Sequence, residues 1–441
     1  MRNRRNRGLV AALTAATALL LTTAATAHAA DETTGGSALT NRVQPRPLQL
    51  LADSKKTPRP LELELESPPC DAATTDCLTI EPASLQVVDR ELKAALAAAA
   101  QSPEVRADTN AGINAIQPVP QRCQGSADSF WVDVSRTEAC ARAAYRLNVR
   151  QKINGVDTIV GTMNFVATFY VYSSTTLATW AHQVQITPTS LTGEAPGTSY
   201  SAVSACNIVP GWQSGACGID AATTIPTQPM IVGRTVAAEA FYTFRGSNLS
   251  TGRGAWRLSF THPTATPVAT NLYASNVRCD TQATTTPGCV NPYFDPTITY
   301  SRAAVPQFAR HVEAAQASGL PGLSTPLHRI VDEIDIRKNG DKACPASLPR
   351  PKTPYAHECD EYPFRSTYEG AYTGGGYTIY PRTHSWCQVS LAGQTTSLGP
   401  MGYSICMIKD TDNSRAGGLL GSFYRSQRVL HMDAFYVRFG A

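Results

Sequence analysis

The side chains best suited to chemistry gather near the end of the chain, in the run His357-Glu358-Cys359-Asp360-Glu361-Tyr362-Pro363-Phe364. Adjacent carboxylates can take a proton from water or hold a hard divalent cation through their oxygens. A proline disfavours helix at the residue before it, so we predict an extended or turning segment in which Asp360 and Glu361 point to different sides. The competing interpretation is an acidic run that is simply solvated.

A second group of oxygen-bearing side chains opens a predicted helix at Asp412 and Asn413. Asx side chains at a helix start commonly cap exposed N–H groups, and this structural role alone would explain both residues. The order of parts also allows a functional role, because acidic residues are followed by a strand and then by a helix that opens with Asn. Metal-dependent nucleases of the ββα type place a general base on the first element and an Asn oxygen ligand at the helix start.

The C-terminal quarter, from about Leu323 to Ala441, resembles the NucA/NucB deoxyribonuclease family. The likeness rests on the motifs Cys359-Asp360-Glu361-Tyr362-Pro363-Phe364, Glu369-Gly370 and Asp412-Asn413-Ser414-Arg415-Ala416-Gly417, and on Phe423-Tyr424-Arg425, Arg428-Val429-Leu430 and Phe435 through Phe439. The resemblance implies a small secreted enzyme that cleaves DNA with a divalent metal and without strong sequence preference. RNA stays open as a second substrate.

The same resemblance implies roles for individual residues. Catalytic roles fall on Asp360, Glu361 and Glu369, and a Mg²⁺ or Mn²⁺ site falls on Asn413 and Asp412. Asp360 is the first choice for the general base, with Glu361 positioning the metal or the water.

The region departs from the short members of the family in one long insertion, from Ala371 to about Tyr403. This insertion contains His384, which is able to act as a base. The identity of the general base is therefore open among Asp360, Glu361 and His384.

Three arginines are the predicted phosphate contacts, namely Arg365, Arg415 and Arg425. Planar guanidinium groups bind phosphate oxygens in pairs. Each of the three is alternatively an ordinary surface residue.

The twelve cysteines fall in order into six short-range couples, which are Cys70–Cys77, Cys123–Cys140, Cys206–Cys217, Cys279–Cys289, Cys344–Cys359 and Cys387–Cys406. An even count in an exported chain indicates a disulfide framework, and we predict nearest-neighbour pairing although sequence alone does not define connectivity. A zinc site is the alternative, but the chain has no Cys-x-x-Cys pair and its eight histidines are scattered.

The N-terminal residues 1–29 have the parts of a secretory signal peptide: an arginine-rich head, an apolar run from Gly8 to Ala27, and the cleavage site Ala27-His28-Ala29. A membrane anchor is the alternative. The four arginines of the head account for the whole excess of 38 basic over 34 acidic residues, so overall charge gives no argument for a nucleic-acid or membrane partner. We expect a secreted, extracellular monomer that has no membrane contact after the signal is removed.

Between the signal and the nuclease-like region the sequence predicts two further parts. Residues 30–120 are rich in Pro and Ala and read as a stalk or pro-segment, with a strand over 61–65 and a helix over 84–100. Residues 121–305 alternate with period two, with Asn154-Gly155 at a hairpin turn, and predict an antiparallel β-sandwich of roughly seven to ten strands. His182 on its apolar face is expected in the core with its ring nitrogens hydrogen-bonded.

Residues 306–441 predict a small α+β domain: a helix from Pro306 to about Gly319, a strand over 403–408, a helix capped by residues 410–413, and a strand over 435–439. The expected fold class is thus a disulfide-rich, multidomain chain in which an all-β sandwich precedes a ββα-metal-like nuclease domain. The alternative is an extracellular binding or surface protein that carries an inactive nuclease-like domain. A serine esterase is disfavoured because no Gly-x-Ser-x-Gly is present.

Overall fold

The computed structural model describes residues 59–61, 63–65, 76–100, 117–124, 129–208, 217–219, 222–375, 380–391, 393, 395 and 398–441. The predicted signal peptide and much of the Pro/Ala-rich segment lie outside these residues. No helix within the described ranges is long and apolar enough to cross a membrane.

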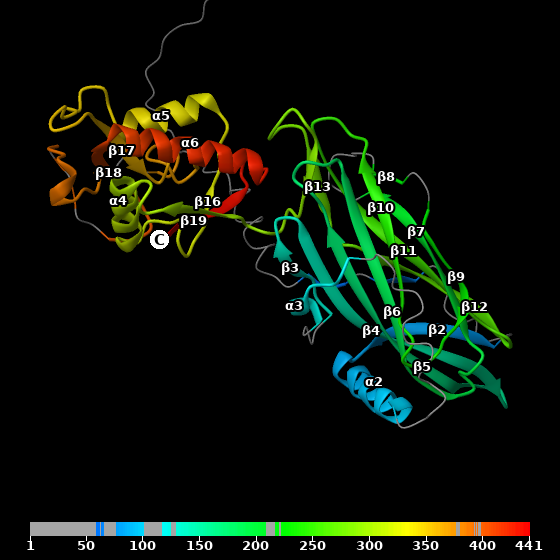
Figure 1. Ribbon diagram of the computed structural model, residues 1–441. Helices are drawn as coiled ribbons and strands as arrows, with labels where there is room; N and C mark the ends of the chain where they lie inside the picture. The colour runs from blue at the N-terminus through cyan, green and yellow to red at the C-terminus, as the bar shows by residue number, and fades with distance from the viewer. Residues whose placement is uncertain are drawn as a thin grey trace, which may run out of the picture. The chain divides into compact units, whose positions relative to one another are not determined.

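Most of the described residues before residue 291 are in β-strands, as the period-two pattern of residues 121–305 predicts (Figure 1). The sheet has 14 strands, and its main path runs β14-β13-β11-β12-β2-β4-β5-β6-β10-β8. Its strands are β1 (Leu63–Leu65), β2 (Cys77–Ala83), β3 (Val132–Ser135), β4 (Glu138–Ile153), β5 (Val156–Tyr172), β6 (Thr179–Gly193), β7 (Ser199–Ile208), β8 (Cys217–Gly218), β9 (Thr224–Pro229), β10 (Val236–Phe244), β11 (Leu249–His262), β12 (Ala265–Tyr273), β13 (Val277–Asp280) and β14 (Gly288–Val290).

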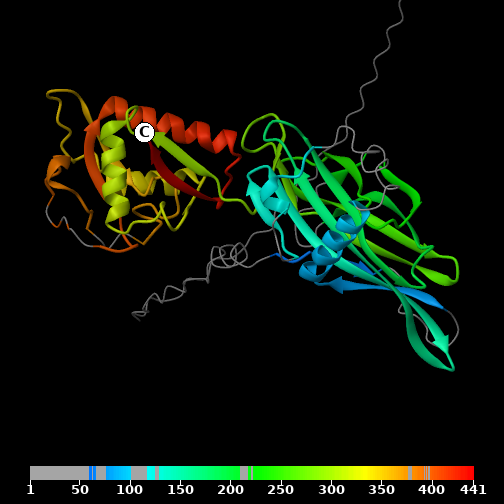
Figure 2. The ribbon, with the colours of Figure 1, turned by 60° about the horizontal axis from the view of Figure 1, so that its bottom comes forward.

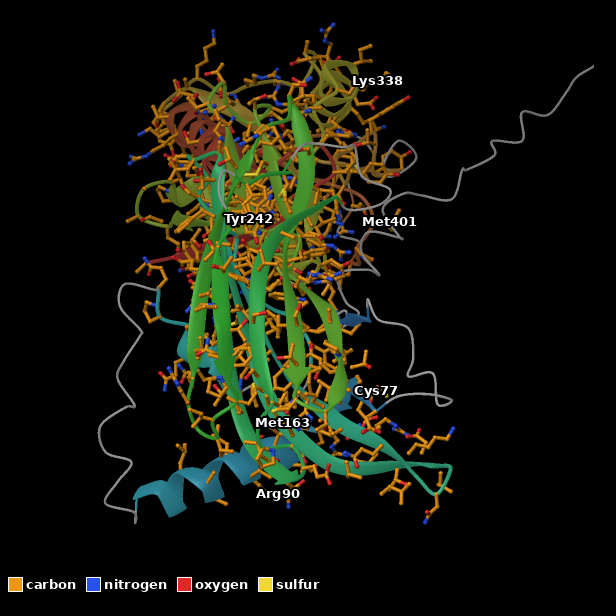
Figure 3. All side chains as sticks on the ribbon, turned by 90° about the vertical axis from the view of Figure 1, so that its right-hand side faces the viewer. Cys77, Arg90, Met163, Tyr242, Lys338 and Met401 are labelled. Carbon is orange, nitrogen blue, oxygen red and sulfur yellow. A yellow bond between two sulfur atoms is a disulfide. The ribbon has the colours of Figure 1, made fainter. Side chains whose placement is uncertain are left out.

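One apolar core lies between the two halves of this sheet. Phe165 of β5 and Phe260 of β11 have ring centroids 5.4 Å apart, and Trp256 of β11 donates its Nε1–H to the carbonyl of His182 in β6. Met163 and Tyr242 are fully buried among the strands (Figure 3). The strand count exceeds the seven to ten expected, in part because β1 and β2 come from the segment before residue 121.

The described part of that N-terminal segment belongs to the sheet, so the expectation of a stalk is wrong for residues 76–100. β2 pairs with β4 along its whole length, and helix α2 (Leu85–Ala100) packs against β4, β5 and β6 (Figure 1). Leu85 and Val88 of α2 are buried against Ala144 and Val166. The short helix α3 (Gln121–Gln124) follows.

His182 lies in the core, but the expectation that its ring nitrogens are hydrogen-bonded is wrong. Neither nitrogen has a partner among the described residues, and the ring packs against Phe169 and Trp256 with centroids 5.9 and 6.4 Å away. Burial lowers the pKa of His182 to about 3. The side chain is therefore a neutral packing element.

The predicted disulfide framework is confirmed at five couples, namely Cys123–Cys140, Cys206–Cys217, Cys279–Cys289, Cys344–Cys359 and Cys387–Cys406. Cys77 is also disulfide-bonded. Its predicted partner Cys70 lies outside the described residues.

The C-terminal domain combines two small sheets with three helices. One sheet has the order β15-β19-β16 and the other pairs β17 with β18. The elements in chain order are β15 (Thr297–Ser301), α4 (Pro306–Ala317), β16 (Leu327–His328), α5 (Glu333–Ala343), β17 (His357–Tyr362), the 3₁₀ turn η3 (Ser385–Cys387), β18 (Ser404–Lys409), α6 (Asp410–Ser426) and β19 (Ala434–Gly440). β15 runs parallel to β19 (Figure 2), so this domain begins before the expected boundary at residue 306.

Helices α4 and α6 were predicted from the sequence, whereas helix α5 was not. Pro306 begins α4 as predicted, and the helix buries Phe308, Val312 and Ala315. Helix α6 follows β18 directly and has Lys409 at its N-cap without a side-chain cap. The expected Asx cap is therefore wrong, and Asp410 and Asp412 instead lie in the first turn, where carboxylates favour the positive end of the helix dipole.

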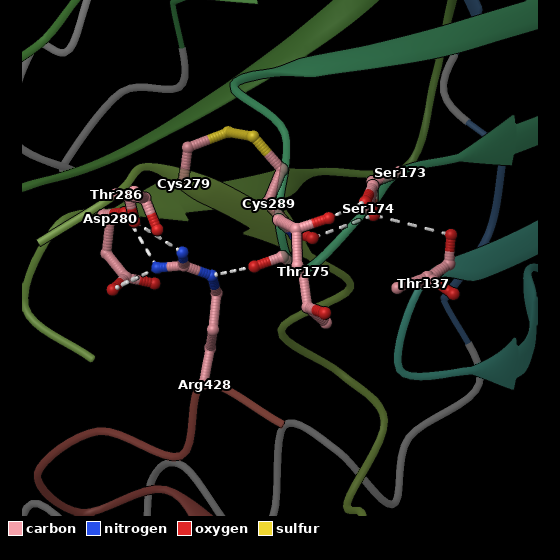
Figure 4. Close-up of a disulfide and its surroundings, with 10 residues drawn as sticks. Thr137, Ser173, Ser174, Thr175, Cys279, Asp280, Thr286, Cys289 and Arg428 are labelled. Atoms are coloured by element: carbon pink, nitrogen blue, oxygen red, sulfur yellow. Dashed lines mark hydrogen bonds and ion pairs between the residues drawn. A yellow bond between two sulfur atoms is a disulfide. The ribbon is translucent and has the colours of Figure 1, made fainter. Parts of the chain in front are cut away.

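A buried arginine ties the end of α6 to the β-sheet part of the chain. Arg428 is fully buried and donates to the Asp280 carboxylate at 2.8 Å, and to the carbonyls of Thr175 and Thr286 at 2.6 and 2.7 Å (Figure 4). The Cys279–Cys289 disulfide closes the loop that carries Asp280 and Thr286. Helix α6 is therefore held at its C-terminal end by the large sheet.

A second ionic contact lies beside the first. Asp433 accepts from Arg136 at 2.8 Å and from Arg278 at 2.7 Å, and all three side chains are largely buried. Burial alone would raise the pKa of Asp433, but the two arginines outweigh it and hold this pKa well below its usual range.

Candidate active site

The acidic run of β17 borders a hollow of about 420 Å³ between β17 and α6. β18 pairs with β17 from Tyr362↔Ser404 to His357↔Lys409, and α6 starts at the next residue. The first turn of α6 therefore lies beside the N-terminal end of the acidic strand β17. The polar groups at the hollow are Glu358, Asp360, Glu361, Arg365, Ser366, Asn413 and Ser414.

Asp360 is held by a histidine that sequence reasoning missed. His311 of α4 donates from Nδ1 to Asp360 Oδ2 at 2.6 Å, and its Nε2 is hydrogen-bonded to Ser404 Oγ at 2.9 Å. His311 and Ser404 are fully buried, and Asp360 is 4% exposed. Both ring nitrogens of His311 are therefore hydrogen-bonded, and the bond to Oδ2 fixes the orientation of the Asp360 carboxylate.

The predicted extended segment is confirmed, since Asp360 and Glu361 are consecutive residues of β17 whose side chains leave the strand on opposite faces, and both still border the hollow. The Glu361 carboxylate lies 3.3 Å from Arg365 Nε, and the Glu361 side chain is 13% exposed. Burial is the main cause that raises its pKa to about 7; the Asp360 carboxylate adds to the rise and Arg365 opposes it. Glu361 can therefore exchange a proton near neutral pH.

Glu358 is a further site residue that the sequence interpretation did not select. Asn413, in the first turn of α6, donates from Nδ2 to Glu358 Oε2 at 3.0 Å. Residues two apart on a strand share a face, so the spacing of Glu358 and Asp360 contained the signal.

The donor set at this rim fits a hard cation held by few protein ligands. The Glu358 carboxylate and the Asn413 amide supply oxygen atoms on the same hollow. The described part of the chain holds no group of three or more His, Cys, Asp or Glu side chains arranged for a metal. Mg²⁺ commonly uses one or two carboxylates and fills its other positions with water and substrate phosphate, so this sparse set suits it.

Two of the predicted site residues lie away from the hollow and have structural contacts. Glu369 accepts from His328 Nδ1 at 2.7 Å and from the His328 backbone N–H at 2.9 Å, which fixes β16. Asp412 accepts from the backbone N–H of Gln307 at 2.9 Å and so binds the first turn of α4. Neither side chain borders the hollow.

Of the three arginines predicted as phosphate contacts, only one borders the hollow. Arg365 borders the hollow, whereas Arg415 and Arg425 are exposed on α6 and do not. A neighbouring hollow of about 300 Å³ shares Glu358, Glu361, Arg365 and Asn413 with the first and is lined in addition by Arg337 and Arg350. These two arginines were not predicted from the sequence.

His384 does not border either hollow. It precedes the turn η3 and stacks on Trp386 with ring centroids 5.5 Å apart. Burial lowers its pKa, and the nearby His311 and Arg310 lower it further. The geometry therefore gives no support to His384 as the base.

The carboxylates, the amide oxygen and the arginines at these hollows are groups that can bind a divalent cation and phosphate oxygens. The model of the family Deoxyribonuclease NucA/NucB matches residues 336–438. The match confirms the resemblance of the C-terminal region to this family. Neither a curated protein nor a solved structure shows a significant match to the chain.

Proposed function

We propose that this protein is a secreted endonuclease that uses a divalent metal to hydrolyse the phosphodiester bonds of DNA with little sequence preference. The observation that carries the proposal is the convergence of Glu358, Asp360, Glu361 and Asn413 on one hollow, inside the region that matches the family. The order β17, β18, α6 supports a ββα-metal type of site.

In the proposed mechanism Asp360 is the general base. His311 holds one oxygen of its carboxylate, so the other oxygen is left to take a proton from the attacking water. Glu361 helps to orient this water, and Arg365 binds a phosphate oxygen. Arg337 and Arg350 in the adjoining hollow bind neighbouring phosphates.

Mg²⁺ or Mn²⁺ would be held by the carboxylate of Glu358 and the amide oxygen of Asn413. The ion supplies stabilisation of the negative charge on the phosphate and on the leaving oxygen. Asp412, expected from the sequence as a ligand, is replaced in this role by Glu358, because its own carboxylate is bound to α4.

Export is part of the proposal and rests on two supports. Residues 1–29 have the composition of a signal peptide, and five disulfides join ten of the described cysteines. Disulfides persist in oxidising compartments outside the cytoplasm.

The test is digestion of plasmid DNA, and of RNA in parallel, by the purified protein with Mg²⁺ or Mn²⁺ and with a chelator. Asp360→Asn and Asn413→Ala should each lower the rate at least about 100-fold, the usual loss on removing a proton-transfer group or a metal ligand. Arg415→Ala is the matched control, because Arg415 is exposed on α6 and away from the hollow, and it should change the rate less than about threefold.

Two results would contradict the proposal. If the wild-type protein fails to cut DNA with every metal tested, the result would favour the alternative, an extracellular binding protein with an inactive nuclease-like domain. Full activity in both site variants would retain the nuclease but refute the site.

A further inference from the structure

The floor of the main hollow is apolar, although its rim is polar. Tyr300, Phe308, Phe364, Leu420 and Tyr424 line it, and each is less than 9% exposed. Water, a cation and one phosphate group need no such surface. An apolar floor beside the carboxylates points to an apolar part of the ligand next to the reacting phosphate.

Two glycines of helix α6, Gly417 and Gly421, leave part of this hollow free of side chains. Asn413, Gly417 and Gly421 follow one another at intervals of four residues and all border the hollow. A Cβ atom at Gly417 would meet no atom within 4 Å, so the glycine leaves free space rather than avoiding a clash. Glycine is disfavoured inside helices, and its place here fits close approach of a ligand.

The neighbouring hollow is lined mainly by polar and charged side chains. Arg337, Arg350 and Asp341 line it, and it meets the apolar hollow at the shared rim formed by Glu358, Glu361, Arg365 and Asn413. A ligand that spans both would therefore place anionic groups on one side of the carboxylates and an uncharged, flat group on the other. A nucleotide has this combination, with a phosphate chain on one side and a planar base on the other.

We propose that the apolar hollow takes up the base of an unpaired nucleotide next to the scissile phosphate, so that single-stranded DNA is the better substrate. This inference rests on the proposed nuclease function and names its substrate class. Bases in a duplex are stacked and paired, and they reach such a hollow only after being turned out of the helix. A base on apolar and aromatic side chains is bound about 5- to 150-fold more tightly than the sugar-phosphate alone.

The test uses an oligonucleotide in which every linkage but one is a phosphorothioate, so that one phosphodiester is cut. The rate of cleavage is measured for the single strand, for the same strand annealed to its complement, and for single strands with a tetrahydrofuran abasic residue on the 5′ or the 3′ side of the scissile bond. We expect the single strand to be cut about tenfold faster than the duplex, and one of the two abasic strands to lose about the same factor.

A matched pair of variants separates the hollow from the rest of α6. Gly417→Leu places a side chain in the hollow, whereas Gly418→Leu makes the same change at a glycine that does not border it and also has open space. Gly417→Leu should slow cleavage of the base-bearing strand about tenfold, and should leave unchanged the rate of the abasic strand that has itself lost the factor of ten, because that strand has no base for the hollow. Gly418→Leu should alter neither, and thermal unfolding of both variants checks that the fold is kept.

Equal cleavage of single strand and duplex together with indifference to both abasic residues would overturn the inference while leaving the nuclease function in place. Equal behaviour of the two leucine variants would overturn it as well. Cleavage of none of these DNAs by the wild-type protein would overturn the proposed function itself, and this inference with it.

Discussion

The hydrogen bond from His311 to Asp360 can be tested by replacing the histidine so that only one of its two bonds survives. The amide nitrogen of Asn lies near the position of Nδ1, and the amide of Gln reaches near that of Nε2. His311→Asn therefore keeps the donor to Asp360, and His311→Gln keeps the contact with Ser404. His311→Ala removes both.

The structure sets the expected size of these effects. Asp360 is 4% exposed, so loss of its partner leaves a buried carboxylate without compensation, which typically costs about 3 to 5 kcal/mol of folding stability. If Asp360 is the base, losing its fixed orientation should lower the rate of DNA cleavage by about 10²- to 10⁴-fold. We expect this loss for His311→Gln and His311→Ala, and a loss of less than about tenfold for His311→Asn.

The assay is the initial rate of plasmid cleavage from pH 6 to pH 9, beside urea unfolding of each variant. A purely structural role would make activity follow stability in all three variants. The reasoning would be refuted if His311→Gln were as active as His311→Asn at equal stability, because the donor to Asp360 would then be irrelevant to the reaction.

Two further predictions concern stability and pH. Arg428→Met removes five hydrogen bonds and leaves the fully buried Asp280 without its cation, so it should lower the free energy of unfolding in urea by about 3 to 5 kcal/mol. The control Arg415→Met should change this free energy by less than about 0.5 kcal/mol. A loss below about 1 kcal/mol for Arg428→Met would contradict the buried contact. The raised pKa of Glu361 favours its neutral form in the fold, so its contribution to stability is present below the unfolded value of 4.5 and is lost as pH rises through about 7. In metal-free buffer, Glu361→Gln should therefore gain thermal stability relative to the wild type between pH 6 and pH 8, and parallel curves for the two proteins would show that this carboxyl does not titrate there.

Local sequence was a good guide to the disulfides, to the acidic strand and to the start of α4, although it gave the wrong cap for α6. The five confirmed disulfides join cysteines that are adjacent among the cysteines of the chain, and the divergence of Asp360 and Glu361 follows from strand geometry. The start of α4 followed from Pro306. Strand alternation would also have selected Glu358 had it been applied to the whole acidic run.

The features that sequence reasoning missed depend on contacts between distant segments. His311 lies 49 residues before Asp360, and no spacing rule connects a histidine on one helix to an acid on a later strand. Asp412 and Glu369 are acidic residues inside the motifs, yet their partners Gln307 and His328 are on separate elements. A motif therefore indicated which acids matter but not which of them reach the substrate.

The neighbours of β19 bear on how this domain can be separated from the rest of the chain. β19 is the middle strand of its sheet, and both of its partners, β15 and β16, precede residue 336, where the family match begins. A fragment cut to the matched residues would expose the backbone N–H and C=O groups on both edges of β19, and unpaired strand edges promote aggregation. It would also lose His311, so the smallest soluble and complete catalytic fragment of this protein should begin before Thr297 rather than at residue 336.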